Sequence, residues 1–233
     1  NVSFAKKLND KHAFGGSLIL AGQRFMAYGV DNFGQFSLDP DNLSGNRKSD
    51  SFGAGLKFGY QGEVSKGIRV GVSYQSKISM SEFDDYADLF AEQGDFDIPA
   101  DLKLGLTFHA SEAIDLSFDI EHIWYSDIDS IANPISNIFA CPTSPAMGSD
   151  LSSCLGGNNG AGFGWDDMTT FKLGVEWTHH DTRTWRFGYS YGEQPISGDD
   201  VLFNVLAPGV MEQHFTLGLT QRTSGGGAGN FSM

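Results

Sequence analysis

The sequence has few positive charges and no long apolar run. Of its 233 residues only 15 are Lys or Arg, against 29 Asp or Glu, which gives a net charge of −14. A nucleic-acid partner is not expected, because such binding relies on Lys and Arg that neutralise phosphates. Mainly apolar stretches without a charge, such as residues 14–22, are shorter than the ~20 residues that a membrane-spanning helix needs, so a helical membrane protein is excluded.

Cysteine is scarce as well. Cys141 and Cys154 are 13 positions apart in a stretch rich in Gly, Ser, Asn and Pro that contains no His, so a metal site lacks local ligands. We expect a disulfide between them, which would stabilise the fold by roughly 3 kcal/mol in the chain-entropy model and indicates an oxidising compartment. Two unrelated reduced thiols are the alternative.

Apolar and polar residues alternate along many segments of about ten residues. Ile68, Val70 and Val72, for example, alternate with Arg69 and Gly71. A period of two indicates a β-strand with one apolar and one polar face. The pattern predicts nine strands, within residues 2–8, 14–22, 52–61, 68–75, 101–108, 114–121, 171–177, 185–192 and 214–220.

The connections between these strands alternate in length. Short turns at 9–12, 63–67, 111–113 and 180–183 alternate with long loops at 23–50, 81–99, 129–166 and 194–213. A soluble β-sandwich would share the alternation within strands, but this order of turns and loops is typical of a transmembrane barrel, with short periplasmic turns and long extracellular loops. The predicted fold is therefore an all-β, antiparallel transmembrane β-barrel in the outer membrane of a Gram-negative bacterium, in contact with outer-membrane lipid and lipopolysaccharide.

Two further features fit a barrel. Aromatic residues gather near the strand ends, where an interfacial girdle would lie: Tyr60, Tyr74, Trp124, Tyr125, Trp165, Trp177, Trp185, Tyr189 and Tyr191. The polar faces carry charges of both signs, which we expect in the lumen: Lys57, Arg69, Lys103, Asp119, Glu121, Lys172, Glu176 and Arg186. Such charges would pair across the bore or with a plug segment, or else line a solvated channel.

Several motifs resemble the FadL-type outer-membrane transport family, which admits long-chain fatty acids and other hydrophobic molecules. They are Gly164-Trp165-Asp166-Asp167, the segment from Thr184 through Trp185-Arg186-Phe187-Gly188 to Tyr191, Gln194-Pro195-Ile196, Leu206-Ala207-Pro208, and the stretch from Phe83-Asp84-Asp85-Tyr86 to Gly94-Asp95-Phe96-Asp97-Ile98-Pro99. The resemblance spans nearly the whole chain.

The resemblance implies a barrel of 14 strands plugged by an amino-terminal hatch, which nine strands cannot close. If the glycine-rich turn at 223–229 is periplasmic, Phe231 begins the thirteenth strand of the family and residues 2–8 form the fourth. We therefore expect residues 1–233 to be a partial barrel domain, with the hatch, the first three strands and the last strand outside it.

The same count makes the loops at 23–50 and 81–99 the pair that forms a surface groove for hydrophobic ligand in the family. Both loops are rich in large apolar side chains, and we expect eight of them to bind ligand: Phe25, Met26, Tyr28, Phe33, Phe36, Phe83, Tyr86 and Phe90. The last three have the spacing of one stripe of a short helix. The alternative is that these side chains only pack the loops into a lid.

No motif indicates catalysis, a metal or a cofactor. In His179-His180-Asp181 neighbouring strand residues point to opposite faces, and the glycine-rich stretch 160–164 is followed by a strand, where phosphate binding needs a helix. The predicted function is passive uptake of hydrophobic small molecules, long-chain fatty acids or hydrocarbons, with no chemistry performed on them. The alternative is a general porin, or a surface-exposed binding or structural protein of the outer membrane.

Overall fold

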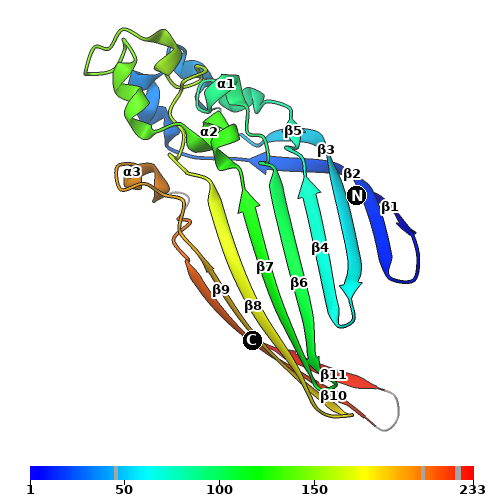
Figure 1. The fold of residues 1–233 in the computed structure, drawn as a ribbon. Coiled ribbons are helices and arrows are strands. Elements are labelled where there is room, and N and C mark those ends of the chain that lie inside the picture. The colour runs from blue at the N-terminus through cyan, green and yellow to red at the C-terminus, as the bar shows by residue number, and fades with distance from the viewer. Residues whose placement is uncertain (45–46, 206–207, 224–226) are drawn as a thin grey trace.

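The computed structural model describes residues 1–44, 47–205, 208–223 and 227–233, and these form one curved antiparallel sheet with a cap of loops (Figure 1). The strands are β1 Val2–Lys7, β2 His12–Phe25, β3 Ser49–Ser65, β4 Ile68–Gln75, β5 Ser79–Met80, β6 Asp101–Ser111, β7 Ile114–Ile123, β8 Met168–His180, β9 Arg183–Gly192, β10 Gln213–Arg222 and β11 Ala228–Ser232. Each pairs with its neighbour in chain order, except that the short β5 pairs with β3 and β4 pairs with β6.

All nine predicted strands are confirmed, and Phe231 lies in a further strand, β11. The strand ends differ from the prediction mainly at β2, which continues to Phe25, and at β3, which begins at Ser49. Part of the predicted loop at 23–50 is therefore strand. Two sequence features fall partly outside the described residues, namely the Leu206-Ala207-Pro208 motif and the glycine-rich turn at 223–229.

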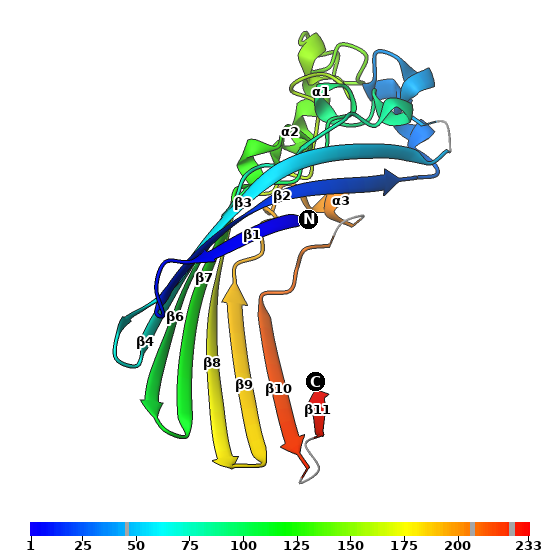
Figure 2. The same ribbon diagram turned by 90° about the vertical axis from the view of Figure 1, so that its right-hand side faces the viewer.

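The tight turns lie at one end of the sheet and the long loops at the other (Figures 1 and 2). The sheet bends like part of a barrel wall, and β1 and β11 form its two edges, unpaired with each other in the described residues. Within the described part of the chain, no helix is both long and apolar enough to cross a membrane.

The apolar face of the sheet is its more exposed face. On β6 the side chains of Leu104 and Phe108 are 42% and 45% exposed, and on β8 Leu173 is 55% exposed. The alternating residues Lys103 and Lys172 are less open to solvent. A soluble domain buries its apolar row. Here the polar row is the less exposed one, as the inner side of a curved wall is.

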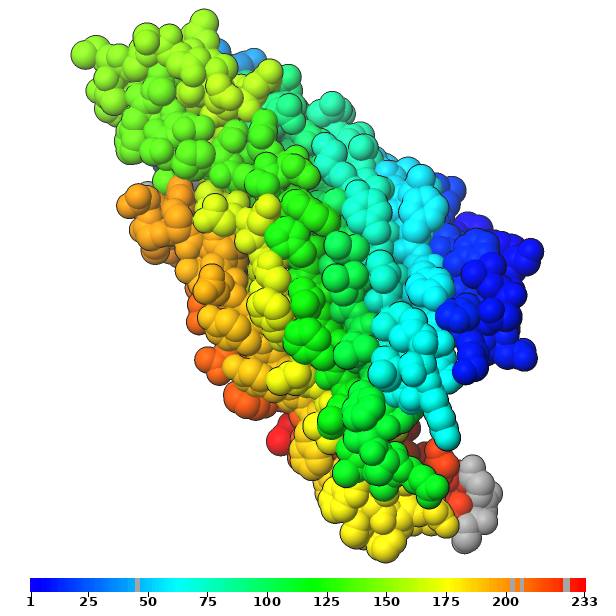
Figure 3. All heavy atoms as spheres, viewed as in Figure 1, coloured from blue at the N-terminus to red at the C-terminus, as the bar shows by residue number. Residues whose placement is uncertain are grey.

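Four loops form the cap at one end of the sheet, and in Figure 3 the green atoms of loop 124–167 make up most of its visible surface. They are loops 26–48, 76–100, 124–167 and 193–212. Their helices are short: η1 Val30–Phe36, η2 Pro40–Asn42, η3 Asp84–Tyr86, α1 Ala91–Gly94, η4 Tyr125–Asp127, α2 Asp129–Ala132, η5 Ile135–Ala140, η6 Leu151–Ser153 and α3 Val201–Asn204.

The cap also covers part of the polar face near the upper end of β3. Ile78 and Met80 pack with Ile19 from β2, and a Cβ added at Gly53 or Gly55 would overlap Met80 or Ile78. The two glycines therefore leave room for loop 76–100 to lie directly on the strand.

Candidate functional site

An aromatic cluster joins the end of β2 to loop 76–100. The ring of Phe25 lies 6.0, 4.8 and 5.0 Å from the rings of Phe83, Tyr86 and Phe90. The last three side chains are only 2%, 0% and 8% exposed, and Val30 packs beside them. In this conformation the three rings close each other off, so a ligand would reach them only after the cluster opened.

The predicted helix through these three residues is wrong. The chain forms the single 3-10 turn η3 at Asp84–Tyr86 and then the four-residue α1, inside which Glu92 and Gln93 have positive φ angles. Tertiary packing overrides the helical spacing here. The backbone of the loop adopts the conformation that lets the three rings pack around Phe25.

The hydroxyl of Tyr86 fixes both ends of loop 26–48. It donates a hydrogen bond to the carbonyl of Arg47 and accepts one from the backbone N–H of Ala27, each at 2.9 Å. Because the side chain is wholly buried, these hydrogen bonds form away from water. A polar group left there without a hydrogen-bond partner would destabilise the fold more than one at the surface. Loops 26–48 and 76–100 therefore form one packed unit.

The other expected ligand residues divide into two groups. Phe33 and Phe36 are half-buried and pack against a cluster that contains Leu43, Ile135 and Leu155, so they connect loop 26–48 with loop 124–167. Met26 and Tyr28 are 41% and 71% exposed on the surface of the cap. Of the eight residues, these two are open to a ligand without any movement of the cap.

Two of the motifs that resemble the transport family meet in space, namely Gly164-Trp165-Asp166-Asp167 and Gln194-Pro195-Ile196. The indole Nε1 of Trp165 donates a 2.5 Å hydrogen bond to Oδ1 of Asn204, while the backbone of Asp166 donates to the carbonyl of Pro195. Asp200, 5% exposed, accepts a 2.7 Å hydrogen bond from the backbone N–H of Ile135. The motif residues thus attach loop 193–212 to loop 124–167.

Loop 193–212 also holds an apolar hollow that the sequence analysis missed. It has a volume of about 400 Å³, within the range of small-ligand sites. Its apolar lining residues are Ile196, Val201, Val205, Pro208 and Val210. Val201, Val205 and Val210 are each more than half exposed. Exposed apolar side chains that lie together indicate a contact surface. Val201 and Val205 have the i, i+4 spacing of a helix, but the other apolar lining residues follow no periodic pattern, so the fold brings the set together.

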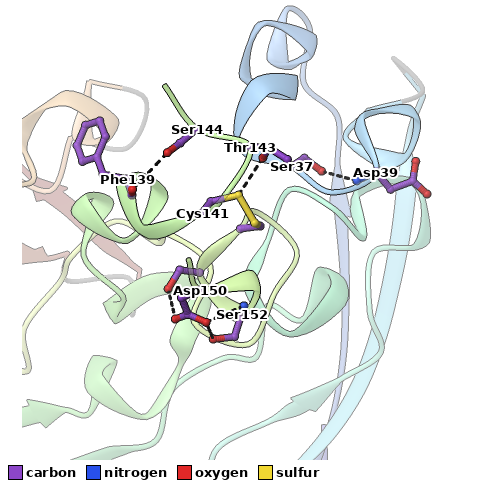
Figure 4. The surroundings of a disulfide bond; sticks show 10 residues. Ser37, Asp39, Phe139, Cys141, Thr143, Ser144, Asp150 and Ser152 are labelled. Atoms are coloured by element: carbon purple, nitrogen blue, oxygen red, sulfur yellow. Dashed lines mark hydrogen bonds between the residues drawn. A yellow bond between two sulfur atoms is a disulfide. The ribbon is translucent and has the colours of Figure 1, made fainter. Parts of the chain in front are cut away.

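Cys141 and Cys154 form a disulfide, as the sequence predicts, inside loop 124–167 (Figure 4). Both residues are fully buried. Beside the disulfide, Asp150 accepts hydrogen bonds from the hydroxyls of Ser152 and Ser153, both at 2.7 Å, and these bonds hold the pKa of its carboxyl below the usual range. The bridge and this cluster fix the tip of the longest loop.

Charged residues on the polar face of the wall pair with their neighbours along the sheet. Glu121 lies between Lys103 and Lys172, with Nζ–Oε distances of 2.7 and 2.6 Å. The side chains of Arg186 and Glu176 meet at 2.6 Å. We predicted pairing across the bore or with a plug, or else a solvated channel wall. Within the described residues, antiparallel register sets Lys103 opposite Glu121, and Glu176 opposite Arg186, so neighbouring strands pair these charges. Pairing across the bore or with a plug stays a prediction.

The remaining predicted lumen charges lie on the same face. Asp119 is opposite Lys172 and beside Gly105, while Lys57 and Arg69 are on β3 and β4. A shallow hollow of about 400 Å³ opens over this region, with Gly71 and Gly105 in its lining.

A pair of carboxyls in loop 76–100 is electrostatically strained. Asp97, 5% exposed, accepts a 2.6 Å hydrogen bond from the backbone N–H of Met80 and pairs with Lys77 at 2.8 Å. Burial first, and then the neighbouring charge of Asp97, raise the pKa of Asp95 to about 6. Asp95 therefore changes its protonation state near pH 6.

The family model described as outer membrane protein transport protein (OMPP1/FadL/TodX) matches residues 1–223. The chain belongs to this family. It is therefore part of an outer-membrane β-barrel protein of a transport family that is not enzymatic. None of the curated proteins matches the chain.

Solved structures support the fold. TodX, the toluene transporter of Pseudomonas putida, matches with 16% identity and a TM-score of 0.58 over 99% of this chain and 61% of its own. The Ralstonia pickettii toluene transporter TbuX matches with 15% identity and a TM-score of 0.56 over 99% of this chain and 59% of its own. A Pseudomonas aeruginosa FadL homologue matches with 15% identity and a TM-score of 0.57 over 95% of this chain and 55% of its own. At such identities the likeness shows the fold alone. The chain spans about three fifths of the length of these proteins.

Proposed function

We propose that this chain forms part of the wall and the outer cap of a channel for the passive uptake of hydrophobic small molecules. The observation that carries the proposal is the inverted sheet, in which Phe171 and Leu173 are 44% and 55% exposed while the intervening Lys172 is paired with Glu121. An apolar outer face suits lipid, and a polar inner face suits a lumen. Family membership adds that such proteins transport hydrophobic compounds.

The cap supplies the apolar surface that the incoming ligand would meet. Met26 and Tyr28 lie open to solvent, and Ala27 between them packs against the cluster that contains Phe83 and Phe90. Each CH₂ that a ligand buries here contributes about 0.8 kcal/mol. We assign first contact to Met26 and Tyr28, and contact with the inner rings to a state in which the cluster opens.

We also propose that β1 to β11 are the fourth to thirteenth strands of a 14-stranded barrel. This count rests on the short turns and on the family resemblance, with β5 treated as part of loop 76–100. Both sheet edges, β1 and β11, would then pair with strands outside these residues.

A surface-binding role is the second candidate. Phe139, Met147 and Leu151 on loop 124–167 are 55%, 83% and 59% exposed, and exposed apolar residues on a loop tip can form a protein contact. A general porin is the third candidate, favoured by the paired charges on the polar face.

Uptake assays with the full-length protein in vesicles that contain lipopolysaccharide separate these functions. We expect labelled hydrophobic compounds to enter protein-containing vesicles faster than empty ones, while entrapped sugars stay inside. Leakage of sugars in a size-limited manner would support the porin. Failure of both compounds to move would leave the binding role as the better account.

A further inference from the structure

The charge of the protein is concentrated in the cap. Loops 26–48, 76–100, 124–167 and 193–212 contain 19 of the 29 acidic residues but only 3 of the 15 basic ones, a net charge of −16. The strands and tight turns carry 10 acidic and 12 basic residues. The entrance to the proposed channel is thus strongly anionic, whereas the wall is close to neutral.

Two of the three cations of the cap pair with carboxylates. Lys77 pairs with Asp97 at 2.8 Å, and Nε of Arg47 lies 4.0 Å from Asp85. The third, Lys48, is two positions from Asp50 in the chain, and Asp50 is paired with Arg24. On the wall below, the same applies to Lys103, Lys172 and Arg186, each of which has a carboxylate partner within 3 Å.

The apolar hollow in loop 193–212 has no basic residue among its described lining residues, and its loop contains none at all. Four carboxylates belong to the same loop, of which Asp200 is buried and bonded to Ile135. A carboxylate ligand that entered the hollow would lose its hydration without gaining a cation, and such burial is costly. An uncharged ligand would meet mainly apolar side chains there, together with the uncharged polar groups of Gln194, Ser197 and Asn204.

We propose that the molecule admitted through this cap is uncharged, a hydrocarbon or a neutral ester, and that the cap discriminates against the ionised carboxylate of a fatty acid. The inference rests on the proposed uptake function and narrows its substrate class. Two features act in the same direction. The net negative charge repels the anion as it approaches, and no basic residue is among the described lining residues of the hollow.

The test compares a long-chain fatty acid with its own methyl ester, both radiolabelled, in vesicles that contain lipopolysaccharide and the full-length protein. At a pH near 8 the acid is ionised, and we expect the ester to enter at least about tenfold faster, once uptake into empty vesicles is subtracted. Lowering the pH towards the pKa of the acid should bring its rate close to that of the ester. Added salt should narrow the difference by screening the cap.

A charge variant tests the hollow itself. Val201→Lys places a cation in the lining. We expect this variant to take up the ester more slowly, and the ionised acid faster, than the native protein does. Leu151→Lys is the matched control, because Leu151 is 59% exposed, close to the 58% of Val201, but lies outside the hollow and should leave the ratio nearly unchanged.

The outcomes separate the two levels of the proposal. Equal rates for ester and ionised acid at high pH, with both above empty vesicles, would overturn the inference about charge and leave the uptake function standing. Preference for the acid would do the same. No protein-dependent entry of either compound would overturn the uptake function and this inference with it. The pH series needs no variant, so it decides the question even if Val201→Lys fails to fold.

Discussion

The hydroxyl of Tyr86 accepts a hydrogen bond of 2.9 Å from the backbone N–H of Ala27, at the point where β2 enters the cap. The same hydroxyl donates to the carbonyl of Arg47, so one buried side chain holds both ends of loop 26–48 against loop 76–100.

Replacing Tyr86 by Phe removes both hydrogen bonds but keeps the ring. The N–H of Ala27 and the carbonyl of Arg47 would be left without this partner, which should destabilise the cap by about 1–3 kcal/mol. We expect faster proteolysis within residues 26–48 and unchanged heat-modifiable migration of the barrel. Tyr28→Phe, at a position that is 71% exposed, is the control and should behave like the native protein.

The double variant Phe83→Ala with Phe90→Ala tests what the aromatic cluster does. Both rings are buried against Phe25, so we expect loss of packing, with loop 76–100 opened to proteases and the barrel still folded. Binding of ligand should weaken more than in Tyr86→Phe, because the double variant also removes two of the inner rings that we assign to ligand contact in the opened cluster. Equal binding in the double variant and in Tyr86→Phe would show that the rings only pack the loops.

The strands were predictable because their signal is local. Alternation of apolar and polar residues needs only a period of two, and turn length needs only counting, so β4, β7 and β8 could be located from sequence alone. The disulfide was predictable for a related reason, since only two cysteines are present and they share one loop.

The cap was predictable only in composition. Its apolar residues were identifiable, but whether Phe83 or Tyr28 faces water depends on contacts between loops that are far apart in sequence. The helix through Phe83 to Phe90 failed for that reason. The hollow around Val201 and Val210 had only a weak periodic signal, because the short helix α3 (Val201–Asn204) supplies part of its lining and irregular backbone supplies the rest.

Glu121→Gln tests the pairing along the wall. The substitution leaves Lys103 and Lys172 without the carboxylate that lies between them, and Glu121 is only 16% exposed, so we expect a loss of about 1–2 kcal/mol in unfolding by urea from vesicles. The combined variant Glu121→Gln with Lys172→Met should recover part of this loss. Glu176→Gln is the comparison, and its effect should be smaller because Glu176 and Arg186 are 42% and 49% exposed. Equal losses of stability in Glu121→Gln and Glu176→Gln would contradict the interpretation that the lower exposure of Glu121 makes its ion pairs more important.

Replacing both Cys141 and Cys154 by Ala should destabilise loop 124–167 by roughly 3 kcal/mol, because the bridge limits the unfolded loop. Hydrogen exchange of the loop should increase strongly, while the strands stay protected. Peptide mapping without reductant gives a direct check on the native protein, in which the two cysteines should appear in one cross-linked pair. Recovery of both as free thiols from normally exported protein would count against the bond.

Asp95 should make the stability of the cap depend on pH. Its pKa is about 6 in the folded cap, against 3.8 for the unfolded residue, so the folded state binds the proton more tightly. The stabilisation is therefore fully present below about pH 4 and is lost as the pH rises through 6. Since Asp95 is only partly buried, we expect the cap to lose about 1 kcal/mol of stability between pH 4 and pH 7.5. This loss is less than the full pKa shift would give. Hydrogen exchange of residues 76–100, corrected for the intrinsic rate at each pH, measures it.

Asp95→Asn supplies a permanently neutral side chain in the same place. It should leave Asp97 paired with Lys77, abolish most of the pH dependence, and make the cap at pH 7.5 more stable than the native cap by about 1 kcal/mol. The control Asp84→Asn removes a carboxyl from an exposed position of the same loop and should keep the native pH profile. A native cap that is instead more stable at pH 7.5 than at pH 5 would mean that Asp95 is stabilised as the anion, by Lys77, and that the burial of its carboxyl does not dominate.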